Sequence, residues 1–294
     1  MGFRTVVVKG RGKIETRLNW LIIRTEQEKW ILLDEIGTLV LETTQSAITT
    51  QALMQLTKSN VNIVFCDEKH LPLSSVVPYY ANYQTSLSVK KQSQWSDDIK
   101  NLVWQQIIKD KILWQSKVLQ YNEKVNECKM LREYIEQVEL GDTTNREGHS
   151  AKVYFNALFG MDFDRRLDGE INAALNYGYA ILLSSVAREI VVAGFITQIG
   201  IHHINQFNHY NLASDLMETF RPILDLHILS LEQGANIKLH AKKILTAKIK
   251  IQDKEYYFDD CLRLYVRGVL SVLCGDSKKM PHIQSFLLGD ESEL

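Results

Sequence analysis

The sequence predicts an α+β protein of two domains, an amino-terminal β-rich domain and a carboxy-terminal all-α helical bundle. Its 294 residues exceed the usual length of one domain, which favours two hydrophobic cores. Short β-branched runs, TVVV, WLIIRT and VNIVFC, alternate with turn signals over the first 75 residues, as in a β-sandwich-like sheet. From about Ser96 onward, apolar residues recur at helical spacing instead.

One helix is expected among the amino-terminal strands. Residues 46–60 carry apolar side chains at helical spacing after Ser46, a residue type that suits an N-cap. Residues 76–95 hold Pro, Ser and polar residues, which favours a linker. We therefore expect a β-rich domain over 1–75, a linker over 76–95 and a helical domain over 96–294.

The carboxy-terminal half predicts a bundle of about six helices. Sustained apolar periodicity supports each of them. The clearest segments are 97–124, 145–159, 168–194, 211–233 and 258–274. Gly160, Gly194 and Gly234 stand where helices of this pattern would stop.

Composition excludes several classes of protein. No apolar run approaches the roughly 18 residues of a membrane span, and the amino terminus does not resemble a secretory signal, so we expect a cytoplasmic protein with no membrane partner. Four scattered cysteines without a CxxC pair disfavour a zinc site and a disulfide framework. They are expected to be buried small hydrophobic residues: Cys66, Cys128, Cys261 and Cys274.

The net charge of -1 does not favour nucleic-acid binding by itself. DNA binding would therefore need segregated charge or help from partners. Residues 163–166 and 238–250 are basic, while residues 133–142 are acidic. Any one of these runs is equally well explained as a solvated face.

Residues 200–222, GIHHINQFNHYNLASDLMETFRP, concentrate imidazoles and amides before a helix with two carboxylates. Asn211 suits the N-cap of that helix, and an apolar i, i+4 stripe follows. Asp215 and Glu218 are three residues apart and share one helical face. Such carboxylates with a nearby histidine suit Mg2+ or Mn2+ better than zinc. Ion pairing with Arg221 explains them equally well.

A second segment, REGHSAKVYF, places Glu147 in the first turn of a helix beside Gly148. Small neighbours leave room for a ligand. A first-turn glutamate is more often a partner of the helix dipole, however.

Together with the β-rich amino-terminal domain, these two segments resemble the CRISPR-associated integrase/endonuclease of the spacer-acquisition machinery, in the form found with type II systems. The resemblance covers the whole chain. It implies that the domain over 1–75 mediates dimerisation and that the domain over 96–294 is catalytic and binds metal. The resemblance further implies that Glu147, His203 and Glu218 are catalytic residues that bind Mg2+ or Mn2+. Asp215 is then a supporting or alternative ligand, and His202 competes with His203 for the histidine role.

The resemblance implies an integrase that inserts short foreign DNA fragments into the CRISPR array, by attack of a 3'-hydroxyl on phosphodiesters at the ends of a repeat. Four basic residues near the ligand segments are candidates for DNA contacts: Arg146, Lys152, Arg188 and Arg221. Implied partners are double-stranded DNA (protospacer and repeat), a second copy of the chain, and a small ferredoxin-like CRISPR-associated dimer that bridges two integrase dimers.

Two other functions stay open. A metal-dependent endonuclease would hydrolyse branched or single-stranded DNA at the same site, with water in place of the 3'-hydroxyl. A non-enzymatic helical scaffold would bind nucleic acid and use the polar cluster only structurally.

Overall fold

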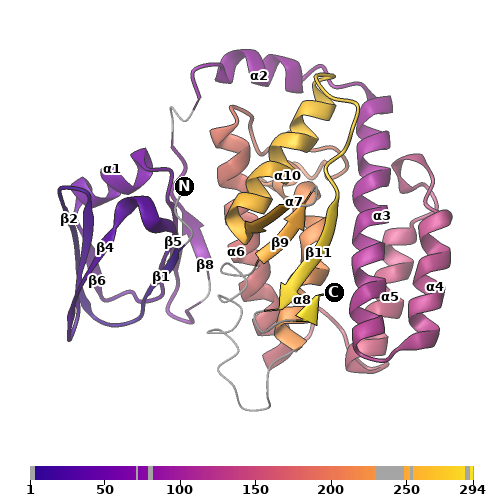
Figure 1. Cartoon of the computed structure of the whole chain (residues 1–294), viewed down its shortest axis with the longest axis horizontal. Coiled ribbons are helices and arrows are strands. Elements are labelled where there is room, and N and C mark those ends of the chain that lie inside the picture. Colours follow the sequence, from indigo (N-terminus) through magenta and orange to yellow (C-terminus); the bar gives the residue numbers. More distant parts are fainter. Residues whose placement is uncertain are drawn as a thin grey trace.

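The computed structural model describes residues 4–70, 72–78, 82–229, 248–251, 254–288 and 292–293. Figure 1 shows the amino-terminal strands on one side of the molecule and the long helices on the other. The mixed α+β class predicted from the sequence is confirmed.

Two four-stranded sheets form the amino-terminal domain, with strand orders β1-β5-β7-β8 and β4-β3-β2-β6. Their strands are β1 (Arg4–Val8), β2 (Gly12–Arg17), β3 (Trp20–Arg24), β4 (Glu28–Leu32), β5 (Ile36–Leu41), β6 (Ser46–Ile48), β7 (Asn62–Cys66) and β8 (Pro72–Ser75). Apolar side chains from both sheets share one buried cluster, among them Ile14, Leu21 and Leu39. The predicted sandwich-like core therefore forms.

Helix α1 (Thr50–Lys58) is the helix expected among these strands, but it begins later than predicted. Its N-cap is Thr49, whose side chain accepts a hydrogen bond from the Ala52 N–H at 3.2 Å. Ser46 instead lies in β6, which pairs with β2. The prediction of Ser46 as N-cap was wrong because the parallel pairing holds residues 46–48 extended.

Strand β5 connects the two halves of the molecule. All six of its residues are buried. Leu39 lies in the sandwich core, whereas Val40 joins the larger cluster built by the helices, as alternation along a strand requires. On the helical side, Asn62 of β7 donates hydrogen bonds to Ser184 and Ser185 of α6 (Glu170–Val192).

The range 76–95, predicted as a linker, contains helix α2 (Thr85–Gln92). Gln92 is buried, and its amide donates to the carbonyls of Ile196 and Ile199 at 2.8 Å each. Its side-chain oxygen accepts the Ile196 N–H at 3.0 Å. This range is thus fastened to the segment that leads into the histidine-rich loop.

The helical half is built around one long central helix, α3 (Asp97–Tyr121), which packs beside α4 and α5 (Figure 1). The other helices here are α4 (Val125–Glu136), α5 (Arg146–Phe159), α6, α7 (Asn211–Met217), α8 (Arg221–Leu229) and α10 (Phe258–Leu273). A 3-10 turn, η3 (Glu218–Phe220), joins α7 to α8.

The prediction that the carboxy-terminal domain is all-α was wrong in one respect, because this half contains a third sheet with strand order β10-β9-β11-β12. Its antiparallel strands are β9 (Lys248–Ile251), β10 (Lys254–Tyr257), β11 (Ile283–Leu288) and β12 (Ser292–Glu293). Most of the basic run 238–250 lies outside the described residues.

The prediction that all four cysteines are buried holds for three of them, and Cys274 is half-buried. All four thiols are free, and three of them are buried: Cys66, Cys128 and Cys261. Within the described parts of the chain, no helix has the length and apolar character needed to cross a membrane.

Candidate functional site

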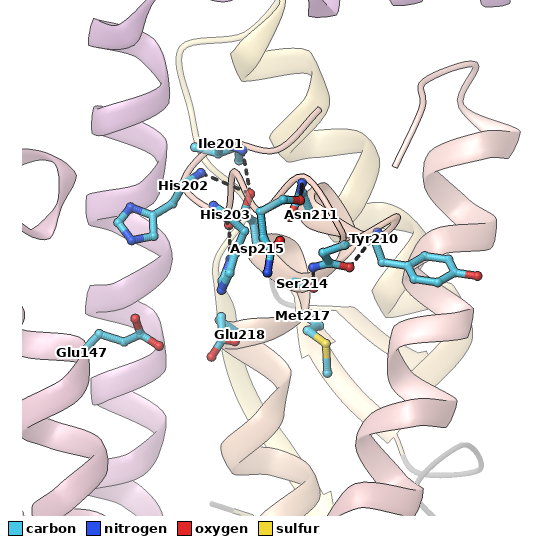
Figure 2. A network of polar contacts seen from close by, with 12 residues as sticks. Glu147, Ile201, His202, His203, Tyr210, Asn211, Ser214, Asp215, Met217 and Glu218 are labelled. Atoms are coloured by element: carbon cyan, nitrogen blue, oxygen red, sulfur yellow. Dashed lines mark hydrogen bonds and ion pairs between the residues drawn. The ribbon is translucent and has the colours of Figure 1, made fainter. Parts of the chain in front are cut away.

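The predicted ligand segments meet beside the central helix α3. Figure 2 shows Glu147 reaching in from α5, while the His203 ring points toward Glu218 from the opposite side. These three side chains come from three separate parts of the fold, so the site depends on tertiary packing.

Glu147 is fixed by the first turn of α5. Asn145 is the N-cap, and its side chain accepts the Gly148 N–H at 3.3 Å. The buried Asp142 carboxylate accepts the N–H groups of Arg146 and Glu147 at 2.8 and 3.0 Å. Two side chains thus satisfy three of the unpaired amides at this helix start and fix the backbone that carries Glu147.

Asp215 organises the loop that carries the histidines (Figure 2). Its carboxylate is completely buried and accepts the backbone N–H groups of Ile201, His202 and His203 at 2.6, 3.2 and 3.0 Å. The loop therefore folds around the Asp215 carboxylate, and Asp215 does not present its oxygens beside Glu218 as a second ligand.

The His203 ring is held by the same carboxylate, with Nδ1 2.6 Å from Asp215 Oδ1. Because a carboxylate only accepts, Nδ1 carries the hydrogen and Nε2 is left for another partner. The hydrogen bond that His203 donates to Asp215 raises the pKa of His203 above its usual range, and the charges of Glu218 and Glu147 add to this.

Asn211 does not cap the helix as predicted, and Tyr210 occupies the cap position without a side-chain hydrogen bond. The Asn211 amide instead donates to the carbonyls of Gln198 and Asn205 at 3.0 Å each, which closes the histidine loop. The predicted apolar stripe is confirmed, since Leu212 and Leu216 are completely buried.

Trp104 of α3 forms the wall behind the loop. Its ring stacks on His202, with centroids 4.3 Å apart and planes 4° apart, and meets His203 edge-on at 5.9 Å. His202 is exposed and held by stacking, whereas His203 has a carboxylate partner. This difference favours His203 over His202 as a metal ligand.

Lys111 of α3 stands between the two glutamates and was missed in the sequence. Its buried Nζ donates to Glu147 Oε1 at 2.7 Å and lies 2.5 Å from Glu218 Oε2. Burial acts to lower the pKa of Lys111, but the charges of Glu218 and Glu147 outweigh it and the pKa is raised. The site therefore contains an internal cation.

Glu218 is 1% exposed and faces two cations. Arg221 Nε lies 3.2 Å from its Oε1, and Lys111 approaches its Oε2. Burial acts to raise the pKa of Glu218, but Arg221 and Lys111 outweigh it, so the pKa is lowered. This glutamate is a carboxylate at neutral pH.

The residues fit a divalent ion, although they are not arranged as a finished site. Among the described residues, no group of three His, Cys, Asp or Glu side chains is close enough to hold a metal. The Glu147 and Glu218 carboxylates nevertheless both pair with the Lys111 ammonium, so the position between them already holds a positive charge. Glu218 Oε2 is 2.5 Å from this ammonium, and a carboxylate oxygen has a second lone pair that could serve another cation.

The four candidates for DNA contact lie in different surroundings. Lys152 is exposed, and the Arg146 guanidinium lies 5.1 Å from the centre of the Tyr134 ring. Arg221 lies 4.8 Å from the Tyr179 ring, beside Glu218.

Arg188 does not lie near the ligands. It is buried between the two halves of the molecule, where it donates to the carbonyls of Gly37 and Asn60 at 3.0 and 3.1 Å and pairs with Glu189. Proximity in sequence was misleading here, and Arg188 is set aside as a DNA contact.

Comparison with solved structures shows which proteins share this fold. A casposase bound to integration product superposes with a TM-score of 0.75 at 20% identity, covering 94% of this chain and 92% of that one. A CAS1 protein from Thermotoga maritima superposes with a TM-score of 0.68 at 14% identity, over 92% and 97% of the two chains.

Sequence comparison carries the relationship further. The CRISPR-associated endonuclease Cas1 of Neisseria meningitidis is 34% identical over 266 residues, 87% of this chain and 87% of the relative. A second endonuclease Cas1, from Saccharolobus solfataricus, is 26% identical over 80% and 78% of the two chains. The family model for CRISPR associated protein Cas1 matches residues 6–246. These matches confirm the resemblance found in the sequence, and the chain belongs to the Cas1 family.

Proposed function

We propose that this protein is a metal-dependent DNA integrase of CRISPR adaptation, in the type II-like form of the family. The observation that carries the proposal is that Glu147 and Glu218 share the Lys111 ammonium while the His203 ring points toward Glu218. The names of its relatives, endonuclease Cas1, and the fold shared with a casposase support DNA strand chemistry.

In the proposed reaction, the 3'-hydroxyl of a DNA fragment attacks a phosphodiester at the end of a repeat, and the bridging 3'-oxygen of the target strand leaves. Glu147, Glu218 and His203 Nε2 would hold Mg2+ or Mn2+, which when bound polarises the phosphate and stabilises charge on its oxygens. No protein nucleophile is needed.

The chain's own residues have distinct parts in this reaction. Asp215 holds the His203 ring so that Nε2 faces the glutamates. Arg221, beside Glu218, supplies positive charge for the phosphate. Arg146 adjoins Glu147 and Lys152 lies further along the same helix, α5; both are proposed to contact the DNA backbone.

The proposed assembly follows the family. Cas6-RT-Cas1--Cas2 complexes are among the solved structures that share the fold, which supports a Cas2 partner. We propose that the domain over 1–75 mediates a homodimer and that a small ferredoxin-like dimer bridges two such dimers on double-stranded DNA. Because this chain has a net charge of -1, phosphate contacts would come from local basic surfaces and from the partner.

A joining assay tests the reaction. A labelled duplex with free 3'-hydroxyls is incubated with a supercoiled plasmid that carries the repeat, with and without the partner and with Mg2+, Mn2+ or EDTA. We expect labelled plasmid only with a divalent ion, and loss of joining in His203→Ala. Lys152→Met is the basic-residue control and should weaken joining mainly at high salt, because the contact proposed for Lys152 is with the DNA backbone alone.

The endonuclease alternative is favoured by the names of the relatives, and the same assay separates it. Nicked plasmid without joined label would support hydrolysis. Full joining activity of folded, dimeric His203→Ala would contradict the assigned site. A folded wild type that neither joins nor nicks the plasmid under any of these conditions would favour the scaffold.

A further inference from the structure

Lys111 lies inside the cluster of proposed ligands, and the inference rests on the proposed function because it concerns the same site. Its Nζ is 2.7 Å from Glu147 Oε1 and 2.5 Å from Glu218 Oε2. The side chain is 6% exposed and rises from a helix whose neighbouring residues, Ile108 and Ile112, are completely buried. A lysine loses solvation in such a place, so its retention calls for a partner of opposite charge.

The charges of this cluster are already balanced. Two carboxylates, Glu147 and Glu218, face two cations, Lys111 and Arg221. The carboxylate of Asp215 is taken up by three backbone N–H groups and the His203 ring. A divalent ion that enters alone therefore leaves about two positive charges without a counter-charge beside the buried Lys111 and Glu218 side chains, where like charges repel more strongly than in water.

A DNA phosphate changes this balance. A phosphodiester at the site adds one negative charge and offers acceptor oxygens. The lysine side chain is long and flexible and has three donor hydrogens, so the ammonium can turn from the glutamates toward the phosphate without leaving the site. The two carboxylates would then be released for the metal.

We propose that Lys111 is a positioning residue that makes metal binding depend on DNA. Without DNA, its ammonium holds Glu147 and Glu218 together and competes with the metal for them. With DNA in place, it moves its contact to the phosphate, and the metal binds between the same two carboxylates. The site is thereby assembled fully only on its substrate.

The test measures metal affinity and needs no catalysis. Free Mn2+ is followed by electron paramagnetic resonance in titrations of the dimeric protein, alone and with a duplex that carries 3'-hydroxyl ends, and binding by the duplex alone is subtracted. In the wild type, DNA should tighten Mn2+ binding at least 10-fold. In Lys111→Met without DNA, binding should be at least 10-fold tighter than in the wild type, and the effect of DNA should shrink to a few-fold.

Two controls separate this role from a general effect of charge. Lys129→Met removes an exposed lysine from α4 and should leave Mn2+ affinity, with or without DNA, unchanged. The melting temperature of Lys111→Met should rise more with Mn2+ than that of the wild type, because the ion replaces the lost ammonium.

Several results would overturn the role of Lys111. One is Mn2+ binding by Lys111→Met that is no tighter than in the wild type without DNA. If that variant does not fold, the titrations of the wild type still test the proposal, because wild-type Mn2+ affinity that is the same with and without DNA contradicts it. Mn2+ binding that survives His203→Ala places the ion elsewhere, and it would overturn the proposed metal site together with this role.

Discussion

Replacing Glu218 by alanine should destabilise the fold as well as abolish activity. The side chain is 1% exposed and lies between Lys111 and Arg221, at 2.5 and 3.2 Å. Removing one member of a buried ion pair costs about 3–5 kcal/mol, because the remaining charge loses its partner in a poorly solvated place. The Arg221 side chain is 33% exposed, so its share of the cost is small and the lower end, about 3 kcal/mol, is expected.

A loss of about 3 kcal/mol corresponds to a fall of about 6–12 °C in melting temperature for a chain of this size. Thermal unfolding followed by circular dichroism measures it, and urea unfolding gives the free energy. Glu133→Ala, at an exposed glutamate, is the matched control and should stay within about 0.5 kcal/mol of the wild type.

A double-mutant cycle gives the sharper test of this ion pair. Lys111→Met combined with Glu218→Ala removes the stranded ammonium, so the double variant should be about 1–3 kcal/mol more stable than Glu218→Ala. If the double variant is no more stable than Glu218→Ala, or if Glu218→Ala unfolds like the wild type, the reasoning from this buried pair is refuted.

Three further predictions concern the histidine loop and the contact between the two halves of the molecule. The rate of joining should rise with pH as His203 loses its proton, and this rise should occur above the usual pKa of a histidine. Asp215→Asn removes the carboxylate that raises the His203 pKa, so the rise should move to lower pH. A pH–rate profile of Asp215→Asn that is not shifted would contradict this. In Gly200→Ala the new Cβ would collide with the His203 carbonyl oxygen and lie 2.7 Å from Asp215 Oδ2, so Mn2+ affinity should fall at least 10-fold. Gly169→Ala is the control: its Cβ has no atom within 4 Å, and Mn2+ affinity should be unchanged. Arg188→Met leaves a buried glutamate unpaired and should cost about 3 kcal/mol in urea unfolding, with unaltered stability counting against this account.

Periodicity predicted most of the fold because most elements have strong local signals. Strand β5 is apolar throughout and helix α6 is long, so both were recognisable in the sequence. The strands β9 and β10 were missed because each has only four residues. The partner of β9 across the sheet, β11, lies after the whole of helix α10. Such strands are stabilised by pairing over a distance, which a local pattern does not reveal.

The candidate site was only partly predictable for the same reason. His203, Asp215 and Glu218 stand close together in the sequence, so their chemistry could be anticipated locally. Glu147 entered through resemblance, since only the packing of α5 against α3 brings it near Glu218.

Lys111 gave a signal that was overlooked. It interrupts the apolar stripe of α3, between Ile108 and Ile112, where a lysine is costly unless it meets a carboxylate. It also lies two helical turns from Trp104, on the same face, where Trp104 supports the histidine loop. A charged residue on an apolar helical face therefore indicated the site as clearly as the histidines did.

The most direct test of the central claim is the position of the metal in a DNA complex. Crystals of the protein with a 3'-hydroxyl duplex and Mn2+ would give an anomalous difference map. We predict one strong peak bound by Glu147, His203 Nε2 and Glu218, with the Lys111 ammonium turned toward a phosphate. A peak that contacts none of these three side chains, with Lys111 still between the glutamates, would contradict the account.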